Sequence, residues 1–194
     1  MPNTMLSLQY ATPLAWVEAV LADFNRFLID HAAAEKKASG MAISMLSHYP
    51  DRPNIVSAMV DLAIEEMTHF REVIKLLHAR GLQLAADTRD PYVNALRALA
   101  RRDSEDYLLD RLLIAGIIEK RGCERFSLVA EALPEGKLQQ FYQSISRSEA
   151  KHGELFLRLA GPWFAPENIA TRLAQLLSEE AKIVAALPIT AALH

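Results

Sequence analysis

The sequence of 194 residues predicts an all-α protein, arranged as a four-helix bundle with one long crossover and short accessory helices at its N- and C-terminal ends. Its composition favours helices, because Ala, Leu, Glu and Arg are frequent and runs of β-branched residues are scarce. Apolar residues recur at intervals of three and four along several long stretches, and Pro and Gly separate these stretches. With 51% hydrophobic residues and 7 Gly, we expect a single well-buried domain over residues 1–194.

The first half of the sequence predicts a short helix and then two long ones. Pro13 fits the first turn of the short N-terminal helix, where proline is tolerated. A long amphipathic helix is expected over residues 23–48, and the segment 49–53, which contains two prolines, ends it and turns the chain. A second long helix is expected over residues 54–80, with Gly81 just beyond its C-terminus. We take these two helices to be antiparallel.

A long connection separates this pair from the next helix. Residues 81–103 are too many for a tight hairpin and contain a short apolar-periodic piece at 92–100, so we interpret them as the crossover. Ser104, followed by Glu105 and Asp106, predicts a capped helix start with acidic residues in its first turn. This third long helix is expected to end near Leu133.

The last third of the sequence predicts a turn and two more helices. Pro134-Glu135-Gly136 turns the chain, and a fourth helix is expected to continue to about Ala160. A fifth helix, over about residues 166–187, carries an apolar stripe and is expected to pack outside the four as the C-terminal accessory helix.

Composition excludes several classes of protein. No apolar run reaches the roughly 18 to 20 residues that span a bilayer, and no secretory leader is recognisable, so we expect a soluble, cytoplasmic protein with no membrane partner. The single cysteine, Cys123, excludes an internal disulfide and a four-cysteine iron–sulfur or rubredoxin module, so electrons must come from outside. The net charge of −3 argues against a broad basic surface for nucleic acid. We interpret the local basic residues as a solvated face rather than a contact surface: Arg80, Arg89, Arg97, Arg101 and Arg102.

Two copies of one pattern carry the most specific information. Each copy is a single Glu followed, after nearly the same interval, by Glu-x-x-His, and the offset between corresponding residues of the two copies is almost constant. Roughly half an occurrence of Glu-x-x-His is expected by chance in a chain of this composition, so two occurrences with a matched upstream Glu are a specific signal. The predicted metal ligands are Glu35, Glu66 and His69 in the first copy, and Glu119, Glu149 and His152 in the second.

The spacing of the copies agrees with the predicted helices. Glu35 stands as far before His48, at the end of its helix, as Glu66 stands after Pro53, where the next helix begins. At a rise of about 1.5 Å per residue, both lie about 20 Å from the same turn. The second copy has the same symmetric spacing about its own turn, so all four carboxylates can meet at one height in the bundle. Within each Glu-x-x-His the two side chains lie on one helical face and can reach one metal ion.

Four carboxylates and two imidazoles form a hard, anionic ligand set. Two divalent cations balance the four carboxylates, which suits Fe(II) or Mn(II). The residues around Glu119 are apolar or small, so this Glu is expected in the interior, where a charge needs a partner or a metal. The set matches that of ferritin-like di-iron and di-manganese bundles. By analogy, Glu66 and Glu149 bridge the metals and the other ligands are terminal.

Several residues near the ligands have two interpretations. His31 lies on the helical face of Glu35 and is either its partner or, as we favour, a solvated or core histidine. Cys123 is expected in the core or beside the site, and not as a nucleophile. The other histidines near helix ends or the terminus are expected to face solvent: His48, His78 and His194. Small residues either leave room for oxygen and a substrate chain or, as we favour, allow close helix packing: Ala38, Ala115, Gly116, Gly122 and Gly153.

Over most of its length the chain resembles one family, the tRNA hydroxylases of the MiaE type, which act on 2-methylthio-N6-isopentenyladenosine. The length of the chain is similar to that of the family, and the resemblance lies in the sequence segments around the predicted ligands. The matching segments are Glu35-Lys36-Lys37-Ala38, Glu65-Glu66-Met67-Thr68-His69-Phe70, Glu119-Lys120-Arg121 and Ser148-Glu149-Ala150-Lys151-His152.

This resemblance implies an oxygen-dependent, non-haem di-iron monooxygenase that hydroxylates the isopentenyl group of the modified adenosine next to the tRNA anticodon. It implies two iron ions, dioxygen as co-substrate, the tRNA anticodon loop as substrate and an external electron donor of the ferredoxin or flavodoxin type. No catalytic residue beyond the metal ligands is predicted. The alternative is a ferritin-like di-iron or di-manganese peroxidase, catalase or ferroxidase. A ferroxidase centre usually lacks the second Glu-x-x-His, and a full-length rubrerythrin-like peroxidase needs a cysteine module, whereas a di-manganese catalase fits the ligand set.

Overall fold

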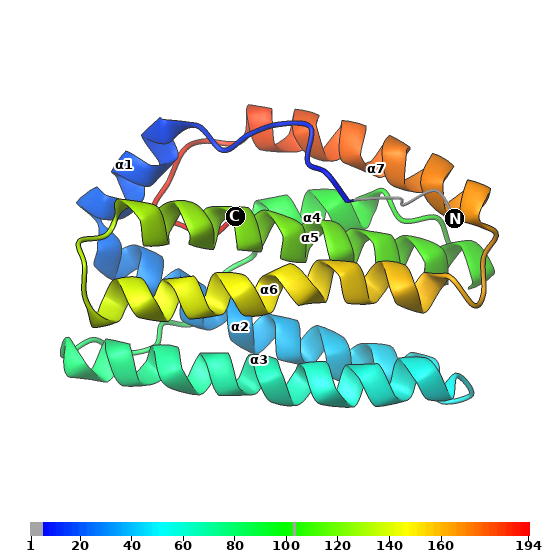
Figure 1. The fold of residues 1–194 in the computed structure, drawn as a ribbon, viewed down its shortest axis with the longest axis horizontal. Helices are drawn as coiled ribbons and strands as arrows, with labels where there is room; N and C mark the ends of the chain where they lie inside the picture. Colours follow the sequence, from blue (N-terminus) through cyan, green and yellow to red (C-terminus); the bar gives the residue numbers. More distant parts are fainter. Residues whose placement is uncertain (1–5, 103) are drawn as a thin grey trace. The chain divides into compact units, whose positions relative to one another are not determined.

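The computed structural model describes residues 6–102 and 104–194, and only the backbone of Ser104. Within these residues it contains seven helices and no strand (Figure 1). They group into two compact units, which we call the α2–α3 unit (residues 18–88 and 190–193) and the α5–α6 unit (the described residues up to Val17, residues 89–189 and His194). The helices are α1 (Leu14–Ala22), α2 (Phe24–His48), α3 (Pro53–Ala79), α4 (Pro91–Ala98), α5 (Ser104–Ala132), α6 (Lys137–Ala160) and α7 (Pro166–Ala186).

The α2–α3 unit is a hairpin of two long helices. The carboxylate of Asp23 accepts a hydrogen bond of 3.1 Å from the backbone N–H of Arg26 and caps the start of α2. Pro53 occupies the first turn of α3, where its missing N–H costs nothing. Gly81 follows α3 with a φ of 69°, a left-handed conformation that favours glycine. The hairpin core is made by Phe27, Leu28, Met45, Ile55, Met59, Leu62, Val73 and Leu77, all buried.

The α5–α6 unit contains a second hairpin, formed by α5 and α6, and α4 and α7 pack with α5. The carboxylate of Asp90 accepts a hydrogen bond of 3.0 Å from the backbone N–H of Val93 and caps α4, whose first residue is Pro91. Large buried side chains fill the interior of this unit: Tyr92, Leu96, Leu108, Leu112, Phe126, Tyr142, Phe156, Leu173 and Leu176. This packing fixes the rotation of α5 and α6 and hence the direction of their polar side chains.

The all-α prediction is confirmed, and the observed helix bounds lie close to the expected ones at every described end. The predicted cap formed by the Ser104 side chain lies outside the described part of the chain, although α5 begins at Ser104 as expected. The assignment of residues 1–194 to one domain stays a prediction. None of the helices in the described ranges is both long and apolar enough to cross a membrane.

Candidate metal centre

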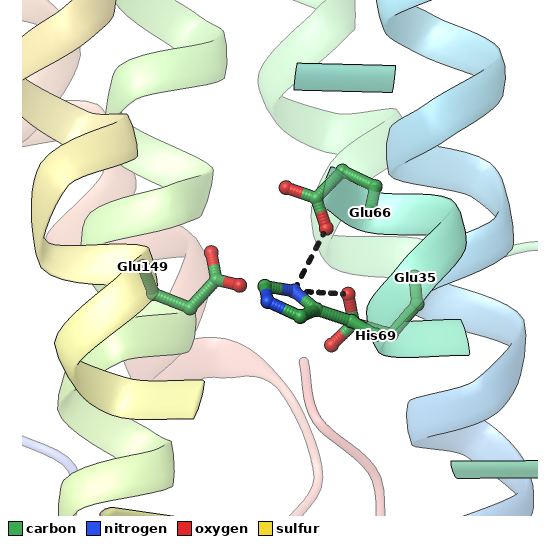
Figure 2. A group of neighbouring side chains, drawn as sticks. All are labelled: Glu35, Glu66, His69 and Glu149. Carbon is green, nitrogen blue, oxygen red and sulfur yellow. Dashed lines mark ion pairs between the residues drawn. The ribbon is translucent and has the colours of Figure 1, made fainter. Parts of the chain in front are cut away.

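The α2–α3 unit brings the first three predicted ligands close to one another (Figure 2). Glu35 comes from α2, and Glu66 and His69 come from α3. Nδ1 of His69 lies 3.5 Å from Oε2 of Glu35 and 3.6 Å from Oε2 of Glu66. One ligand atom from each residue falls within 4.8 Å of the others, a spacing that one metal ion can bridge. Both carboxylates are buried, and the His69 side chain is 12% exposed.

Local helical geometry explains this convergence. Glu66 and His69 stand three positions apart on α3, so their side chains lie one above the other on one face. The Ser39 hydroxyl donates a hydrogen bond of 2.9 Å to the carbonyl oxygen of Ala63 and ties α2 to α3 one turn from the ligands. The register of the hairpin therefore holds Glu35 level with the Glu-x-x-His pair.

His31 is fully buried and contacts Glu35. Its Nε2 lies 2.6 Å from Oε1 of Glu35, one helical turn along α2. The structure thus supports the interpretation of His31 as a partner of the ligand, which the sequence ranked below a solvated or core histidine. An ionised Glu35 carboxylate only accepts hydrogen bonds, so in that state the imidazole donates its Nε2–H.

The α5–α6 unit brings the second three predicted ligands together. Glu119 comes from α5, and Glu149 and His152 come from α6. Nδ1 of His152 lies 3.2 Å from Oε2 of Glu149 and 3.8 Å from Oε2 of Glu119. Here too one ligand atom from each residue lies within 4.8 Å of the others, and all three residues are buried. All six predicted residues therefore belong to two buried clusters of the same composition.

Glycines let α5 and α6 approach closely beside this second cluster. A Cβ added to Gly116 would lie 3.2 Å from the carbonyl oxygen of Gly153, and one added to Gly153 would lie 3.4 Å from that of Gly116. The favoured interpretation of these two small residues as packing residues agrees with these distances. Close approach of the backbones brings the carboxylate of Glu119 within reach of His152 on the neighbouring helix.

Cys123 belongs to the packed interior, as expected. Its thiol lies 3.4 Å from the carbonyl oxygen of Ser146, and the hydroxyls of Ser127 and Ser146 are 2.6 Å apart. Burial raises the pKa of the Cys123 thiol, although its hydrogen bond to Ser146 opposes the shift. A raised pKa keeps the sulfur protonated at neutral pH, which does not suit a nucleophile.

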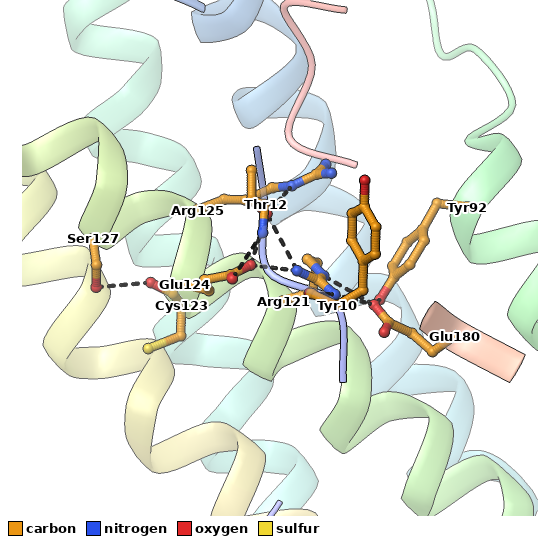
Figure 3. A network of polar contacts seen from close by, with 9 residues as sticks. All are labelled: Tyr10, Thr12, Tyr92, Arg121, Cys123, Glu124, Arg125, Ser127 and Glu180. Atoms are coloured by element: carbon orange, nitrogen blue, oxygen red, sulfur yellow. Dashed lines mark hydrogen bonds and ion pairs between the residues drawn. The ribbon is translucent and has the colours of Figure 1, made fainter. Parts of the chain in front are cut away.

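A buried ionic network lies beside α5, and the sequence did not predict it (Figure 3). Arg121 and Glu180 are both fully buried, and Nη2 of Arg121 lies 2.8 Å from Oε1 of Glu180. The Tyr92 hydroxyl donates a hydrogen bond of 3.0 Å to the same carboxylate oxygen. Arg121 also donates to Thr12 and Glu124. The network thereby joins α5 to α4, α7 and the segment before α1.

Charges in this network shift the pKa of its members. Burial alone lowers the pKa of Arg121, but the nearby Glu180 and Glu124 carboxylates outweigh burial and raise it. Burial and the negative charge of Glu180 raise the pKa of Tyr92 well above its ordinary value. Burial and the adjacent Arg121 lower the pKa of Arg125 to about 10, so Arg125 stays protonated at neutral pH. One signal in the sequence could have revealed the network, since Glu180 falls within the apolar stripe of the last helix.

The basic residues of the crossover behave differently from one another. Arg97 and Arg102 are exposed, as expected for a solvated face, but Arg101 forms an ion pair with Asp110 at 2.7 Å. Arg172 pairs with the same carboxylate at 2.8 Å. Burial raises the pKa of Asp110, but the hydrogen bonds from Arg101 and Arg172 outweigh it and lower the pKa to about 2.

Two of the three histidines expected to face solvent do so. His48 and His78 are exposed. The expectation for His194 is wrong, because its side chain is only 7% exposed. Its Nδ1 lies 3.1 Å from Oδ2 of Asp90, and its ring stacks on that of Tyr92 with 5.0 Å between centroids. Aromatic stacking and a hydrogen bond thus hold His194, which its position in the sequence alone assigns to solvent.

The donor atoms of the two clusters fit a metal site. Each cluster offers two carboxylates and one imidazole, which are ligands for Fe(II) and Mn(II). Burying two carboxylates side by side is costly unless cations compensate them. Together the clusters provide four carboxylates, which balance two divalent ions.

Comparisons with known proteins agree with this chemistry. A model of the family described as tRNA-(MS2IO6A)-hydroxylase (MiaE) matches residues 1–194. A tRNA 2-(methylsulfanyl)-N(6)-isopentenyladenosine(37) hydroxylase from Pseudomonas putida is 35% identical over 173 residues, which cover 89% of this chain and 84% of the relative. A protein of the same name from Salmonella typhimurium is 32% identical over 155 residues, which cover 80% of this chain and 56% of the relative.

Among solved structures, a protein with aldehyde deformylating oxygenase activity from Synechococcus has a similar fold. The TM-score is 0.90 at 35% identity, and the match covers 95% of this chain and 92% of that one. With this likeness, the predicted all-α fold of the ferritin-like type is confirmed. The main functional interpretation is supported over the peroxidase, catalase and ferroxidase alternative. From the match over its whole length, the chain belongs to the MiaE family of tRNA hydroxylases.

Proposed function

We propose that this protein is a di-iron monooxygenase that hydroxylates the isopentenyl group of 2-methylthio-N6-isopentenyladenosine in tRNA. The observation that carries the proposal is the pair of buried Glu, Glu and His clusters in a chain of this family. Each cluster holds the ligand types that an oxygen-activating iron needs and no thiolate. The name of the relative from Pseudomonas putida supplies the substrate.

In this proposal the two clusters combine into one dinuclear centre. Their six residues would hold two iron ions, with the four carboxylates balancing the charge. When bound, the two iron ions supply the activation of dioxygen, with two electrons from outside the chain. Overall, one oxygen atom enters an allylic C–H bond of the substrate as a hydroxyl group, and the other leaves as water with two protons.

The residues of the chain contribute position, charge and exclusion of water. Burial of Glu35, Glu66, Glu119 and Glu149, each no more than 7% exposed, keeps bulk water from the ligand atoms. In such an interior each electrostatic contact is stronger than in water. Exclusion of water also protects the reactive site from side reactions. The packed helices therefore prepare the site before substrate arrives.

The proposal also concerns partners and location. The tRNA anticodon loop is the proposed substrate, and the net charge of −3 favours a small, local contact over wrapping by the nucleic acid. A ferredoxin- or flavodoxin-type protein is the proposed electron donor. A tRNA-modifying enzyme of this kind is expected in the cytoplasm.

Metal analysis tests the dinuclear centre. We expect about two iron ions per chain, in line with the ligand count of such bundles, after anaerobic reconstitution of purified protein. Glu119→Ala should lower that content, whereas Glu154→Ala should not, because Glu154 lies on α6 with its side chain 78% exposed. Equal iron content in the wild type and both variants, with unchanged thermal stability, would reject Glu119 as a ligand.

Nucleoside analysis tests the substrate. Deletion of the gene should abolish the hydroxylated form of the modified adenosine in digested cellular tRNA and leave the unhydroxylated form. A plasmid copy should restore it, and a copy with Glu119→Ala should not. An unchanged ratio of the two nucleosides would reject the tRNA hypothesis. Catalase, peroxidase and ferroxidase assays on the same iron-loaded protein would then separate the remaining activities.

A further inference from the structure

We infer that His31 is a positioning residue for Glu35, and that it makes the metal position of the α2–α3 unit different from that of the α5–α6 unit; this inference rests on the proposed dinuclear centre. His31 is fully buried, and its Nε2 lies 2.6 Å from Oε1 of Glu35. A hydrogen bond of this length to a charged carboxylate is among the stronger ones in proteins. The contact is internal to α2, because the residues are four positions apart.

The two carboxylate oxygens of Glu35 have different neighbours. Oε1 of Glu35 accepts from His31, and Oε2 faces His69, whose Nδ1 lies 3.5 Å away. Oε2 is therefore the oxygen directed toward the other ligand atoms of the cluster. With one oxygen engaged by the imidazole, Glu35 presents a single oxygen in a fixed direction to a metal ion.

The packing around His31 holds its ring in place. The ring of Phe27 lies 6.1 Å from that of His31, tilted by 31°. Phe27, Leu28 and Ala32 are all fully buried. A ring confined by such neighbours loses little further freedom when it donates a hydrogen bond, so the carboxylate is oriented before metal binds.

The α5–α6 unit has a different residue at the corresponding place. The residue one helical turn before Glu119 is Ala115, whose methyl group donates no hydrogen bond. The two copies of the ligand pattern thus differ in the residue one helical turn before the single Glu, which is His31 in one copy and Ala115 in the other. We expect the contact with His31 to tighten binding of the ion in the α2–α3 unit, because less order then has to be imposed on the Glu35 carboxylate.

Titration of the metal-free protein with Co(II) tests this inference. Visible absorption of Co(II) and equilibrium dialysis follow the uptake of each ion, and neither depends on turnover. We expect the wild type to take up two ions. His31→Phe keeps an aromatic ring and removes the donor, and it should weaken the binding of one of the two ions by about 10- to 100-fold.

A conservative variant distinguishes positioning from simple packing. His31→Gln places an amide N–H near the former Nε2 and should restore the affinity for that ion to within about threefold of the wild type, a small difference on the scale of such hydrogen bonds. Urea unfolding of each metal-free variant reports on the fold separately, and His31→Ala replaces His31→Phe if the latter does not fold.

Three outcomes would count against the proposals in different ways. Unchanged uptake of both ions by His31→Phe and His31→Ala would overturn the role of His31 and leave the dinuclear centre intact. Loss of one whole ion in His31→Gln would make His31 a ligand instead of a positioning residue. Failure of the wild type to take up two ions would overturn the proposed function itself.

Discussion

The two helical hairpins carry the same pattern of predicted ligands, but different residues surround that pattern in each hairpin. In the α2–α3 unit, His31 stands behind Glu35, and the basic pair after Glu35 reaches outward. Lys36 pairs with Asp87 at 2.8 Å, and Lys37 donates to the carbonyl oxygen of Thr88 at 2.9 Å. These contacts lie at the surface, where ion pairs contribute little to stability.

In the α5–α6 unit the second residue of the basic pair turns inward. Ala115 replaces the histidine, and Arg121, at the position that corresponds to Lys37, is fully buried against Glu180. The repeated text Glu-Lys-Lys and Glu-Lys-Arg therefore describes two different environments. The comparison teaches that both hairpins bring together the same Glu, Glu and His, whereas packing against α4 and α7 decides what surrounds them in one hairpin.

Ligand removal has the largest expected effect and should be equal in the two hairpins. Glu66→Gln and Glu149→Gln keep the shape of the side chain and remove a charge, so each should lower hydroxylation at least about a thousandfold, equivalent to about 4 kcal/mol of lost transition-state stabilisation. Single-turnover assays and metal analysis of both variants measure this. A strong loss for one variant and near-normal activity for the other would show that the two Glu-x-x-His pairs have different roles.

The next largest effect, on the free energy of unfolding, should differ between the two hairpins. Arg121→Met leaves the buried carboxylate of Glu180 without its charged partner, and we expect a loss of about 3 to 5 kcal/mol in the free energy of unfolding. Lys37→Met removes the corresponding surface residue and should cost less than about 1 kcal/mol. Urea unfolding of the metal-free proteins measures both. The double variant Arg121→Met, Glu180→Gln should recover part of the loss, and equal losses for Arg121→Met and Lys37→Met would contradict the comparison.

A difference in acid sensitivity should also distinguish the units. The pKa of Asp110 is about 2 in the folded chain and 3.8 without its partners. Because folding lowers this pKa, Asp110 stabilises the fold above about pH 4, and the contribution of about 2 kcal/mol is lost as the pH falls toward 2. Urea unfolding between pH 5 and pH 2.5 should show the free energy of unfolding fall with pH in the wild type. The fall should be smaller in Asp110→Asn.

Asp87 in the α2–α3 unit provides the control for this pH dependence. The hydrogen bond from Lys36 lowers the pKa of Asp87, but the Asp87 side chain is 50% exposed and solvent screens the pair. Asp87→Asn should therefore leave the pH dependence of the wild type nearly unchanged. If Asp87→Asn reduced the pH dependence of the free energy of unfolding as much as Asp110→Asn does, the assignment of acid sensitivity to the α5–α6 unit would be contradicted.

The sequence predicted most of the helices and all residues of both clusters, for identifiable reasons. Pro53, Gly81 and Gly136 end or begin helices through backbone chemistry that acts locally, so the helix bounds could be predicted closely. The members of the two clusters could be predicted because a metal site would restrict both residue type and spacing. Their role as metal ligands stays a proposal.

Contacts between distant segments could not be predicted in the same way. Arg121 and Glu180 are far apart in the sequence. The position of Glu180 in an apolar stripe signals a buried charge, but nothing in its own segment identifies Arg121 as the partner. His194 was assigned to solvent because nothing in its own segment reveals Asp90 and Tyr92. His31 and Glu35 are near in sequence, but whether that face of α2 is buried depends on packing that the helical period alone does not specify.

The smallest expected effect compares two helical glycines, one from each hairpin. Gly40 on α2 has no atom within 4 Å of the place where a Cβ would stand, so Gly40→Ala should stabilise the metal-free protein by about 0.5 to 1 kcal/mol through helix propensity. Gly116 on α5 would bring a Cβ to 3.2 Å from the carbonyl oxygen of Gly153 and 3.3 Å from the Leu6 side chain. Gly116→Ala should therefore cost about 1 to 3 kcal/mol, because the helices must move apart.

Urea unfolding measures both glycine variants, and Co(II) uptake shows which cluster responds. Gly153 is next to His152, so separation of α5 from α6 should weaken the cluster of the α5–α6 unit and leave that of the α2–α3 unit unchanged. If Gly116→Ala left the stability unchanged, there would be free space between α5 and α6 beside the predicted ligands. The small residues there would then leave room in the site instead of allowing close helix packing. Opposite signs for the two variants would show that the same residue type is a helix defect in one hairpin and a packing requirement in the other.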